Sequence, residues 1–470
     1  MMRSILSLLA LILICNLVFG QENQSFFVEG YTDQLSYLPG DQVHFHLSSS
    51  EDICHVAIRR LGLENTLVWE MDSLPVQMQH VPERASTHGC DWPVTHSLKI
   101  PEDWQTGYYE VSLQIDDEGG TFVHRNRRSA EGAMFFVVRS ARPGQNTKIL
   151  LQLATNTYNA YNNWGGSSLY GYHGRANLQG HRVSFDRPPR SLFYRWEHDF
   201  IKWAEKNGYV LDYAVNSDLE FRPEVLEHYN LVLSVGHDEY WSTPMRDHLE
   251  AYIENGGHVA FFSGNSVCWQ VRSEDEGRAL TCWKQWYNMD PVYQTDDHSK
   301  LSTLWGHHLV DRPENELTGV GFLHGGYHRS HGQFMDGSGA YTVHRPDHWL
   351  FEGTDLQPDQ EFGGKHTVVG YECDGCEMTL VDGLPEPTHR DGTPDNFVIL
   401  ATAPARWHPD DSWWYERWDK DRIGHAVLGT YTNGGTVVTV GSTDWAHGLR
   451  GGDDAVEQIT KNVLDKLSID

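Results

Sequence analysis

Along the first third of the chain, apolar and polar positions alternate in the way that is typical of β-strands. Four segments predict strands, at 43–47, 56–58, 109–115 and 135–138. In the third segment, one face carries Tyr109, Val111, Leu113 and Ile115. Turn residues at 39–41 and 118–120 separate these segments. Short strands with frequent turns predict an all-β sandwich domain over residues 21–142.

Beyond residue 146 the pattern changes to apolar runs that alternate with helical segments. The runs predict strands at 149–153, 210–215, 231–235, 259–262, 367–369, 397–400 and 436–440. Helical spacing is seen in Phe193, Trp196, Phe200 and Trp203. Thr243 before Pro244 predicts a helix start, with Thr243 as the N-cap. Strands that alternate with helices predict an α/β domain over 146–470 with a mostly parallel sheet, interrupted by a long irregular excursion at 270–360.

The first twenty residues differ from the rest of the chain. A positively charged start at Arg3 precedes an apolar run over 5–18, and Gly20 offers a small residue for cleavage. This is the pattern of a secretory signal peptide over residues 1–20. The run is shorter than the ~20 apolar residues that a membrane span needs. We therefore expect a protein that is secreted or periplasmic.

Charge narrows the range of partners. The chain has 65 acidic and 36 basic residues, a formal net charge of −29. Such a chain repels nucleic acids and anionic membranes, so we expect neither as a partner. Six cysteines follow the leader and fall in local pairs: Cys54 with Cys90, Cys268 with Cys282, and Cys373 with Cys376. In an exported protein these pairs predict disulfide bonds.

Polar residues gather where five of the predicted strands end. The segments that follow those strands are 155–166, 236–241, 263–266, 370–374 and 441–445. Because ligands of open parallel sheets bind beyond the carboxyl ends of the strands, these segments predict one site at that edge.

The residue types at this edge are compatible with several kinds of chemistry. The nearest match to a serine-nucleophile elbow, 264–268, lacks its last glycine, and no His-Glu-x-x-His zinc motif occurs. Glu239 and Glu372 could serve as the carboxylate pair of a glycoside hydrolase. Phenols and carboxylates at the same edge instead favour a site of hard oxygen ligands, which suits Fe³⁺ better than zinc.

Four blocks of sequence resemble a known family. They are 158–166 (Tyr-Asn-Ala-Tyr-Asn-Asn-Trp-Gly-Gly), 183–189 (Val-Ser-Phe-Asp-Arg-Pro-Pro), 236–241 (Gly-His-Asp-Glu-Tyr-Trp) and Gly264-Asn265. Together they resemble the large (β) subunit of the N,N-dimethylformamidase family over residues 146–470. A weaker likeness extends to 104–109 in the β domain.

The resemblance implies a glutamine-amidotransferase-like α/β domain and a mononuclear iron held by two tyrosines and one glutamate. Matched residue by residue, the metal ligands correspond to Tyr109, Tyr158 and Glu239, with Tyr108 adjacent to the first. The polar residues beside the metal, with catalytic roles, correspond to His237, Asn265 and Glu372.

The expected function is therefore metal-dependent hydrolysis of C–N bonds in linear amides. The substrate is a small-molecule amide or a carbohydrate-linked one, and a homo-oligomer is compatible with the sequence. The rival expectation is a non-catalytic glycan-binding protein that stacks sugars on aromatic rings. The tryptophans near the predicted edge are Trp164, Trp241, Trp269 and Trp445.

Overall fold

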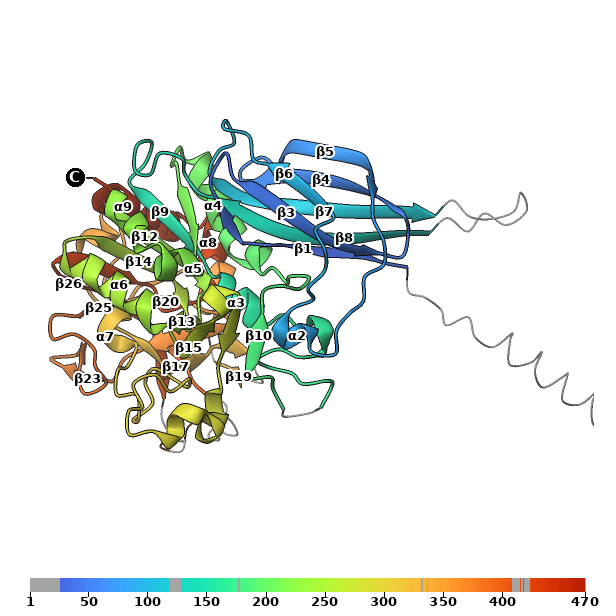
Figure 1. The fold of residues 1–470 in the computed structure, drawn as a ribbon. Helices are drawn as coiled ribbons and strands as arrows, with labels where there is room; N and C mark the ends of the chain where they lie inside the picture. The colour runs from blue at the N-terminus through green and yellow to red at the C-terminus, as the bar shows by residue number, and fades with distance from the viewer. Residues whose placement is uncertain are drawn as a thin grey trace, which may run out of the picture.

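The computed structural model describes residues 26–117, 128–175, 178–330, 333–335, 337–407, 415, 417 and 423–469. It shows a mixed α/β protein with a β-rich N-terminal region at one side of a larger α/β region (Figure 1). The predicted signal peptide, 1–20, lies outside the described residues.

Two sheets form the N-terminal region. One has the strand order β1-β3-β6 and the other β2-β8-β7-β4-β5. Their bounds are β1 Val28–Thr32, β2 Ser36–Tyr37, β3 Gln42–Ser49, β4 Ile53–Leu61, β5 Thr66–Pro75, β6 His96–Lys99, β7 Gly107–Asp117 and β8 Arg128–Val138, with the short helix α2 at Ala85–His88. Side chains from both sheets, such as Phe45 and Val111, share one buried core. All four predicted strand segments lie within strands of this region.

Strand β7 links this region to the rest of the molecule. The predicted apolar face of the strand is confirmed, because Tyr109 and Val111 lie in the core between the two sheets. Tyr108 points the other way and stacks on Phe193 of the α/β region, with ring centroids 3.8 Å apart. The two faces of one strand therefore belong to two different cores.

The α/β region is built on a sheet of nine described strands in the order β11-β9-β12-β14-β27-β26-β25-β20-β21. The bounds are β9 Ile149–Leu153, β11 Asp212–Val215, β12 Leu231–His237, β14 His258–Gly264, β20 Tyr341–Val343, β21 Glu361–Phe362, β25 Val398–Ala405, β26 Gly424–Asn433 and β27 Gly435–Thr439. From β11 to β27 the neighbours are parallel, and from β27 to β21 they are antiparallel. The sheet is thus mixed, where a mostly parallel one was expected. Apolar runs predict strands but not strand direction, and a tight turn at Gly434 forces β26 and β27 to run antiparallel.

Helices cover both faces of this sheet. The helices are α3 Thr155–Ala160, α4 Glu197–Lys206, α5 Asn216–Phe221, α6 Thr243–Glu254, α7 Asn315–Thr318, α8 Trp445–Gly451 and α9 Asp454–Leu467. On one face, α4, α8 and α9 bury residues such as Phe200 and Ile459, and on the other α5 and α6 bury residues such as Leu249. The N-cap of α6 is Ser242, whose side chain accepts a hydrogen bond from Met245 N. The helix is therefore capped one residue before the predicted position, Thr243. Within the described part of the chain, no helix is long and apolar enough to cross a membrane.

Short elements make up the excursion and several other connecting segments. A four-stranded sheet combines β10 Arg182–Ser184, β13 Tyr240–Ser242, β15 Trp269–Glu274 and β16 Ala279–Thr281. Further strands are β17 Gly321–Tyr327, β18 Arg329–Ser330, β19 Gln333–Phe334, β22 Glu372–Gly375, β23 Met378–Val381 and β24 Leu384–Pro387. The 3₁₀ helices are η1 Trp164–Gly166, η2 Phe193–Arg195, η3 Pro223–His228, η4 Asp275–Gly277, η5 Lys284–Met289, η6 Pro291–Gln294, η7 Trp349–Phe351 and η8 Gly364–His366.

One predicted strand and three predicted disulfides are not found. Residues 367–369 form no strand, because Thr367 adopts a left-handed conformation (φ 51°) directly after η8. Cys54, Cys90, Cys268, Cys282, Cys373 and Cys376 are all buried and unbridged. For the last pair the reason is topological, since Cys373 and Cys376 belong to different core clusters.

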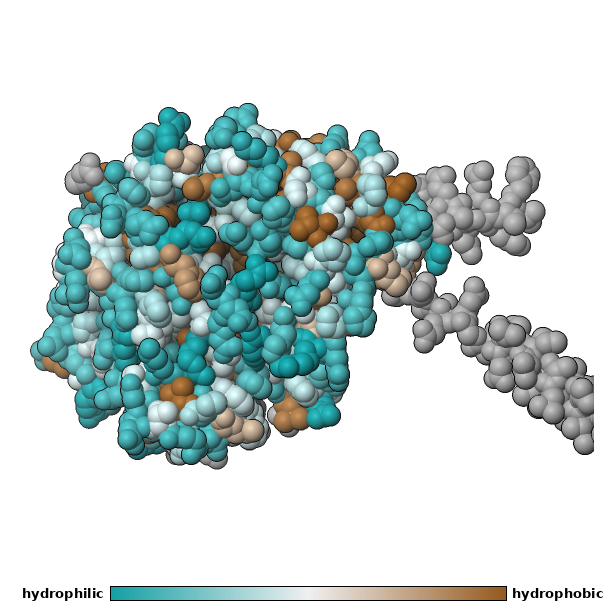
Figure 2. Space-filling model, in the orientation of Figure 1, coloured by the Kyte–Doolittle hydropathy of each residue, from teal (hydrophilic) through white to brown (hydrophobic). Residues whose placement is uncertain are grey.

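One side of the molecular surface is predominantly polar (Figure 2). Figure 2 shows a face that is mostly hydrophilic, with apolar residues in small scattered groups. Apolar groups of this kind are ordinary on soluble domains.

Candidate active site

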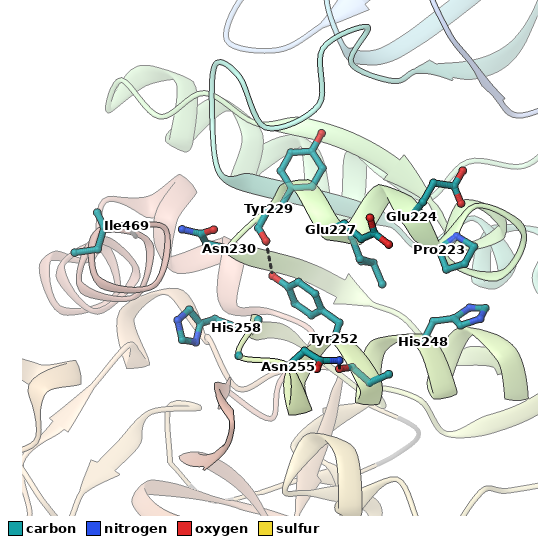
Figure 3. Close-up of a pocket in the computed structure, with 14 residues that line it drawn as sticks. Pro223, Glu224, Glu227, Tyr229, Asn230, His248, Tyr252, Asn255, His258 and Ile469 are labelled. Atoms are coloured by element: carbon teal, nitrogen blue, oxygen red, sulfur yellow. Dashed lines mark hydrogen bonds between the residues drawn. The ribbon is translucent and has the colours of Figure 1, made fainter.

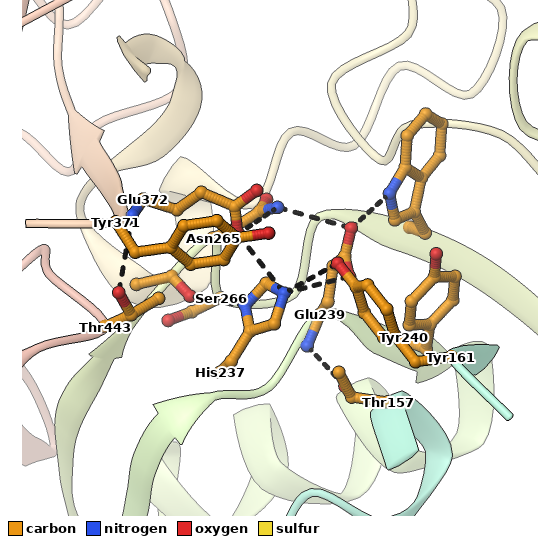
Figure 4. Close-up of polar contacts among 12 residues, drawn as sticks. Thr157, Tyr161, His237, Glu239, Tyr240, Asn265, Ser266, Tyr371, Glu372 and Thr443 are labelled. Carbon is orange, nitrogen blue, oxygen red and sulfur yellow. Dashed lines mark hydrogen bonds and ion pairs between the residues drawn. The ribbon is translucent and has the colours of Figure 1, made fainter. Parts of the chain in front are cut away.

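The carboxyl ends of two neighbouring parallel strands place the first residues of the candidate site. His237 is the last residue of β12 and pairs in register with Gly264, the last residue of β14. Glu239 and Asn265 follow these strand ends directly (Figure 4). As predicted from the sequence, the polar residues after these strands converge at one sheet edge.

Four buried polar side chains form the centre of the cluster. His237 Nε2 lies 3.2 Å from Glu239 Oε2 and 3.2 Å from Glu372 Oε2. Asn265 Nδ2 donates to Glu239 Oε1 at 3.3 Å and to Glu372 Oε2 at 3.4 Å. All four residues are at most 4% exposed. The structure therefore brings together four of the six side chains that the sequence assigns to the site.

Glu372 lies on a different kind of strand from the one predicted. It begins β22, which pairs antiparallel with β17, and does not follow a parallel strand. Asp374 on the same strand accepts hydrogen bonds from Asn265 N (2.9 Å) and Ser266 N (3.0 Å). β22 thus supplies one carboxylate to the cluster and a second one to the loop that holds Asn265.

Gly264 is the point where these segments meet. A Cβ atom at this residue would lie 2.5 Å from Thr443 N and 2.6 Å from the carbonyl oxygen of Glu372. No side chain fits there, so only glycine lets β14 approach β22 and the segment after β27 so closely.

Three tyrosines, which were not assigned to the site from the sequence, bond to the cluster or to one another beside it. Tyr170 OH donates to both carboxylate oxygens of Glu239, each at 2.8 Å. Tyr240 OH donates to Tyr170 OH at 2.8 Å, and Tyr161 OH lies 3.1 Å from His237 Nε2. In addition, Trp269 Nε1 donates to Glu239 Oε1 at 2.7 Å.

A buried lysine completes the network. Lys284 Nζ donates to Tyr240 OH at 3.0 Å and lies 3.5 Å from the centre of the Tyr170 ring. Burial lowers the pKa of Lys284 to about 8, although the charge of Glu239 acts in the opposite direction. A hydrogen-bonded chain therefore runs from the ammonium group through Tyr240 and Tyr170 to Glu239.

The pKa values of the three ionisable groups in the cluster are shifted in different directions. Burial lowers the pKa of His237, but Glu372 and Glu239 outweigh it and hold that pKa at about 9. Burial raises the pKa of Glu372 to about 7, against the effect of His237. Burial also raises the pKa of Glu239, yet His237 and Lys284 bring it below its usual value. At neutral pH this favours an ionised Glu239, a protonated His237 and a Glu372 that exchanges its proton readily.

The hydroxyl groups of Tyr109 and Tyr158 lie outside the polar cluster. Tyr109 OH donates to the carbonyl oxygen of Gln105 at 2.6 Å, and its ring stacks on Trp104 in the β-rich region. Tyr158 OH donates to Glu197 Oε1 at 2.5 Å. Neither hydroxyl contacts Glu239 in the described structure, and Tyr108 OH donates to Ser191 instead. In the sequence, Tyr161 stands only three residues after Tyr158, so the block itself contained the signal for the tyrosine that reaches the cluster.

Partly exposed aromatic rings form the mouth of the cluster. Tyr161 and Tyr371 are half-buried, and Tyr170 is 37% exposed although its hydroxyl reaches Glu239. The rings of Tyr161 and Tyr170 stack with centroids 4.2 Å apart. Arg195 is exposed beside them and lies over the rings of Trp196 and Tyr371. These aromatic rings therefore lie between the buried cluster and the solvent.

A separate groove of about 720 Å³ lies at the other end of the strands (Figure 3). It is lined by η3, α6 and the residues that precede β12 and β14, among them Asn230 and His258. Across it, Tyr252 OH donates to the carbonyl oxygen of Tyr229 at 3.2 Å. Because Asn230 and His258 stand at the amino ends of parallel strands, this groove is distinct from the polar cluster.

The donor atoms of the cluster suit a hard metal ion. Within the described residues, no group of three or more His, Cys, Asp or Glu side chains is arranged to hold a metal. Phenol oxygens are further donor atoms at the cluster, because the hydroxyl of Tyr161 lies beside His237 and that of Tyr170 beside Glu239. Two phenol oxygens and a carboxylate are hard ligands of the kind that bind Fe³⁺.

Fold and cluster together define a mixed α/β protein with a buried carboxylate, imidazole and phenol site at a sheet edge. The family model described as "N,N-dimethylformamidase beta subunit-like, C-terminal" matches residues 55–460, so the chain belongs to this family. The match confirms the resemblance read from the sequence blocks and begins well inside the β-rich region.

Two curated relatives carry the same name. The chain is 22% identical to the N,N-dimethylformamidase beta subunit of Alcaligenes sp over 484 aligned residues, and 22% identical to that of Paracoccus aminophilus over 488. These alignments cover 85% and 86% of the chain. They cover 58% of the length of each relative, so the chain spans little more than half of those proteins.

Proposed function

We propose that this protein is an exported, iron-dependent hydrolase that cleaves C–N bonds in linear amides. The observation that carries the proposal is the position of His237 Nε2, 3.2 Å from each of two buried carboxylates and beside the amide of Asn265. Membership of the dimethylformamidase family and the names of the two relatives support the same reaction class.

The cluster contains the groups that amide hydrolysis needs. Glu372 accepts a proton from the attacking water, whose oxygen bonds to the amide carbon. His237, protonated at neutral pH, returns a proton to the nitrogen as the C–N bond breaks. Asn265 Nδ2 donates to the oxygen on which negative charge develops. The proton that Glu372 accepted then passes to His237 Nε2, 3.2 Å away, so both groups regain their starting states, and the products are a carboxylic acid and an amine.

The proposed iron is held by Glu239, Tyr161 and Tyr170. This set replaces Tyr109 and Tyr158, whose hydroxyls bond to Gln105 and Glu197. When bound, Fe³⁺ supplies Lewis acidity that polarises a carbonyl group and acidifies water. The ionised state of Glu239 and its 2.8 Å contacts with Tyr170 support this assignment.

The proposed fold type is glutamine-amidotransferase-like. Its support is the parallel half of the large sheet, β11-β9-β12-β14-β27, with helices on both faces and the cluster at the carboxyl edge.

Two observations favour the amidase over its rivals. Trp241, Trp269 and Trp445 are at most 2% exposed, so they offer no stacking surface to a glycan. Trp164 donates to Glu29 at 2.7 Å and is half-buried. The imidazole of His237 contacts both carboxylates, a position in which a glycoside hydrolase would need room for its sugar.

The test combines metal analysis with a substrate screen. We expect about one iron per chain, a visible tyrosinate-to-iron absorption band, and formate or acetate release from small amides. Protein expressed in iron-replete medium that binds no iron and cleaves no amide would contradict the proposal. Mass analysis of protein exported by a suitable host, with a new N-terminus at Gln21, tests the signal peptide.

A further inference from the structure

We propose that the amide substrate carries a carboxylate and that Arg195 binds this carboxylate at the mouth of the site. The inference rests on the proposed hydrolase function and adds the charge class of its substrate.

Arg195 is fixed beside the cluster by two aromatic rings. It ends η2, and its Cζ lies 4.4 Å from the centre of the Trp196 ring and 4.6 Å from that of Tyr371. Those rings are centred 5.6 Å and 5.8 Å from the ring of His237. A single aromatic ring therefore separates the exposed guanidinium group from the imidazole at the centre of the site.

Arg195 forms no ion pair with any acidic residue that the structure describes. Arg60, Arg182 and Arg272 each pair with a carboxylate at 2.9 Å or less. The nearby Asp444 is occupied, because its carboxylate accepts from Trp196 Nε1 (2.8 Å) and Tyr371 N (2.9 Å).

Stacking leaves the useful part of the guanidinium group accessible. Arg195 Cζ lies over both rings, and a guanidinium group stacked on an aromatic face keeps its in-plane N–H donors free for other partners. That planar fork matches the two oxygens of a carboxylate, with which arginine forms two parallel hydrogen bonds. An exposed arginine held in this way at a site entrance is suited to recognise an anion.

The charges inside the site determine how such a substrate is placed. Glu239 and Glu372 repel a second carboxylate from the interior, so the anionic end stays at Arg195 while the uncharged amide enters. This order selects short amides with a carboxylate a few atoms from the C–N bond, as in N-acyl amino acids. Water adds to the acyl carbon, the C–N bond breaks, and one proton of the water passes to the nitrogen. The products are a carboxylic acid and an amino acid.

The test compares two substrates that differ only in charge. N-formylglycine carries the carboxylate, and N-formylglycinamide carries a neutral carboxamide of the same shape. We expect kcat/KM for formate release to favour N-formylglycine at least about 10-fold in the native protein, since hydrogen bonds to charged groups contribute ~1.5–3 kcal/mol. Arg195→Gln should remove this preference by raising KM for the anion alone, and Arg195→Lys should restore part of it.

The matched control is Arg142→Gln, which removes an exposed arginine away from the cluster and should leave the preference unchanged. A native protein that hydrolyses both substrates equally well overturns the role of Arg195 and leaves the hydrolase function intact. If neither compound is hydrolysed, the affinities of both compounds for the iron-loaded protein are measured by calorimetry and compared. Equal affinities, or a preference that Arg195→Gln preserves, then overturn the inference.

Discussion

Tyrosine serves two different purposes in the two regions of this molecule. In the β-rich region, Tyr109 is buried among Trp104 and Phe136, and its hydroxyl has one neutral partner, the carbonyl oxygen of Gln105. At the edge of the large sheet, Tyr170 and Tyr161 direct their hydroxyls toward Glu239 and His237. The ring is structural in the first region, and the hydroxyl group is part of the site in the second.

The comparison shows that the partner of a phenol decides its chemistry. A phenol with an unperturbed pKa near ~10 loses its proton only where a strong positive charge stabilises the phenolate. Burial raises the pKa of Tyr109, and only the charge of Arg60 acts against this. Burial and the charge of Glu239 raise the pKa of Tyr170 as well, so its ionisation depends on the proposed iron, while Lys284 Nζ lies 3.5 Å from the centre of its ring. Four predictions test this contrast, from the largest expected effect to the smallest.

Glu239→Ala should have the largest effect, because this carboxylate contacts Tyr170, Trp269 and His237 together. We expect kcat/KM to fall by more than about 10³-fold, or about 4 kcal/mol of transition-state stabilisation, and the iron content to drop. Kinetics and elemental analysis provide the measurement, with far-UV circular dichroism to show that the fold persists. A folded variant with native activity would exclude the proposed metal ligand.

Paired tyrosine substitutions sharpen the comparison directly. Tyr161→Phe and Tyr170→Phe should each shift or remove the visible tyrosinate-to-iron band and lower kcat/KM by about 10- to 100-fold, the effect of losing a hydrogen bond to a charged group. Tyr109→Phe and Tyr158→Phe are the matched controls and should retain the band. If the band survives in the first pair and is lost in the second, the original assignment of Tyr109 and Tyr158 is restored.

Tyr158 has a further consequence for stability, through Glu197. Burial raises the pKa of Glu197 to about 8, so the folded protein keeps a proton that the unfolded chain loses near pH 4.5. This contribution favours the fold below pH 4.5 and is lost as the pH rises toward 8, by a few kcal/mol in the free energy of unfolding. Denaturant unfolding at pH 5 and pH 8 should show a smaller pH effect in Glu197→Gln than in the native protein. Equal pH effects would contradict the raised pKa.

The smallest expected effect belongs to Tyr109→Phe. Its hydroxyl has one hydrogen bond, to the carbonyl oxygen of the exposed residue Gln105, which water can replace. We expect the free energy of unfolding to fall by about 0.5–1.5 kcal/mol, with kcat/KM unchanged. A larger loss of activity than of stability would mean that the β-rich region contributes to the reaction.

Local patterns were enough to predict the part of the site that lies on regular strands. The apolar runs before His237 and Asn265 marked the ends of β12 and β14, and the shared edge of parallel strands then implied their proximity. The one-face alternation that includes Tyr109 in β7 was predicted equally well. In each case the periodicity of the strand itself carries the information.

Contacts that depend on long loops could not be predicted in this way. Tyr170 lies in an irregular segment, and Lys284 follows two short strands within the excursion. Glu372 was expected after the apolar triplet 367–369, but it reaches the cluster from an antiparallel strand. No periodicity in these segments specifies a partner, because the partner is fixed by the packing of the whole region.

The close approach at Gly264 has a consequence for how this protein can change during evolution. Backbone from three segments, those that carry Asn265, Glu372 and Thr443, touches at that one residue, so none of them can shift alone. The short turn that ends at Arg195 is not among the backbone segments nearest to this junction. Selection can therefore alter which molecules are admitted by changing the entrance, while the reactive groups stay in place.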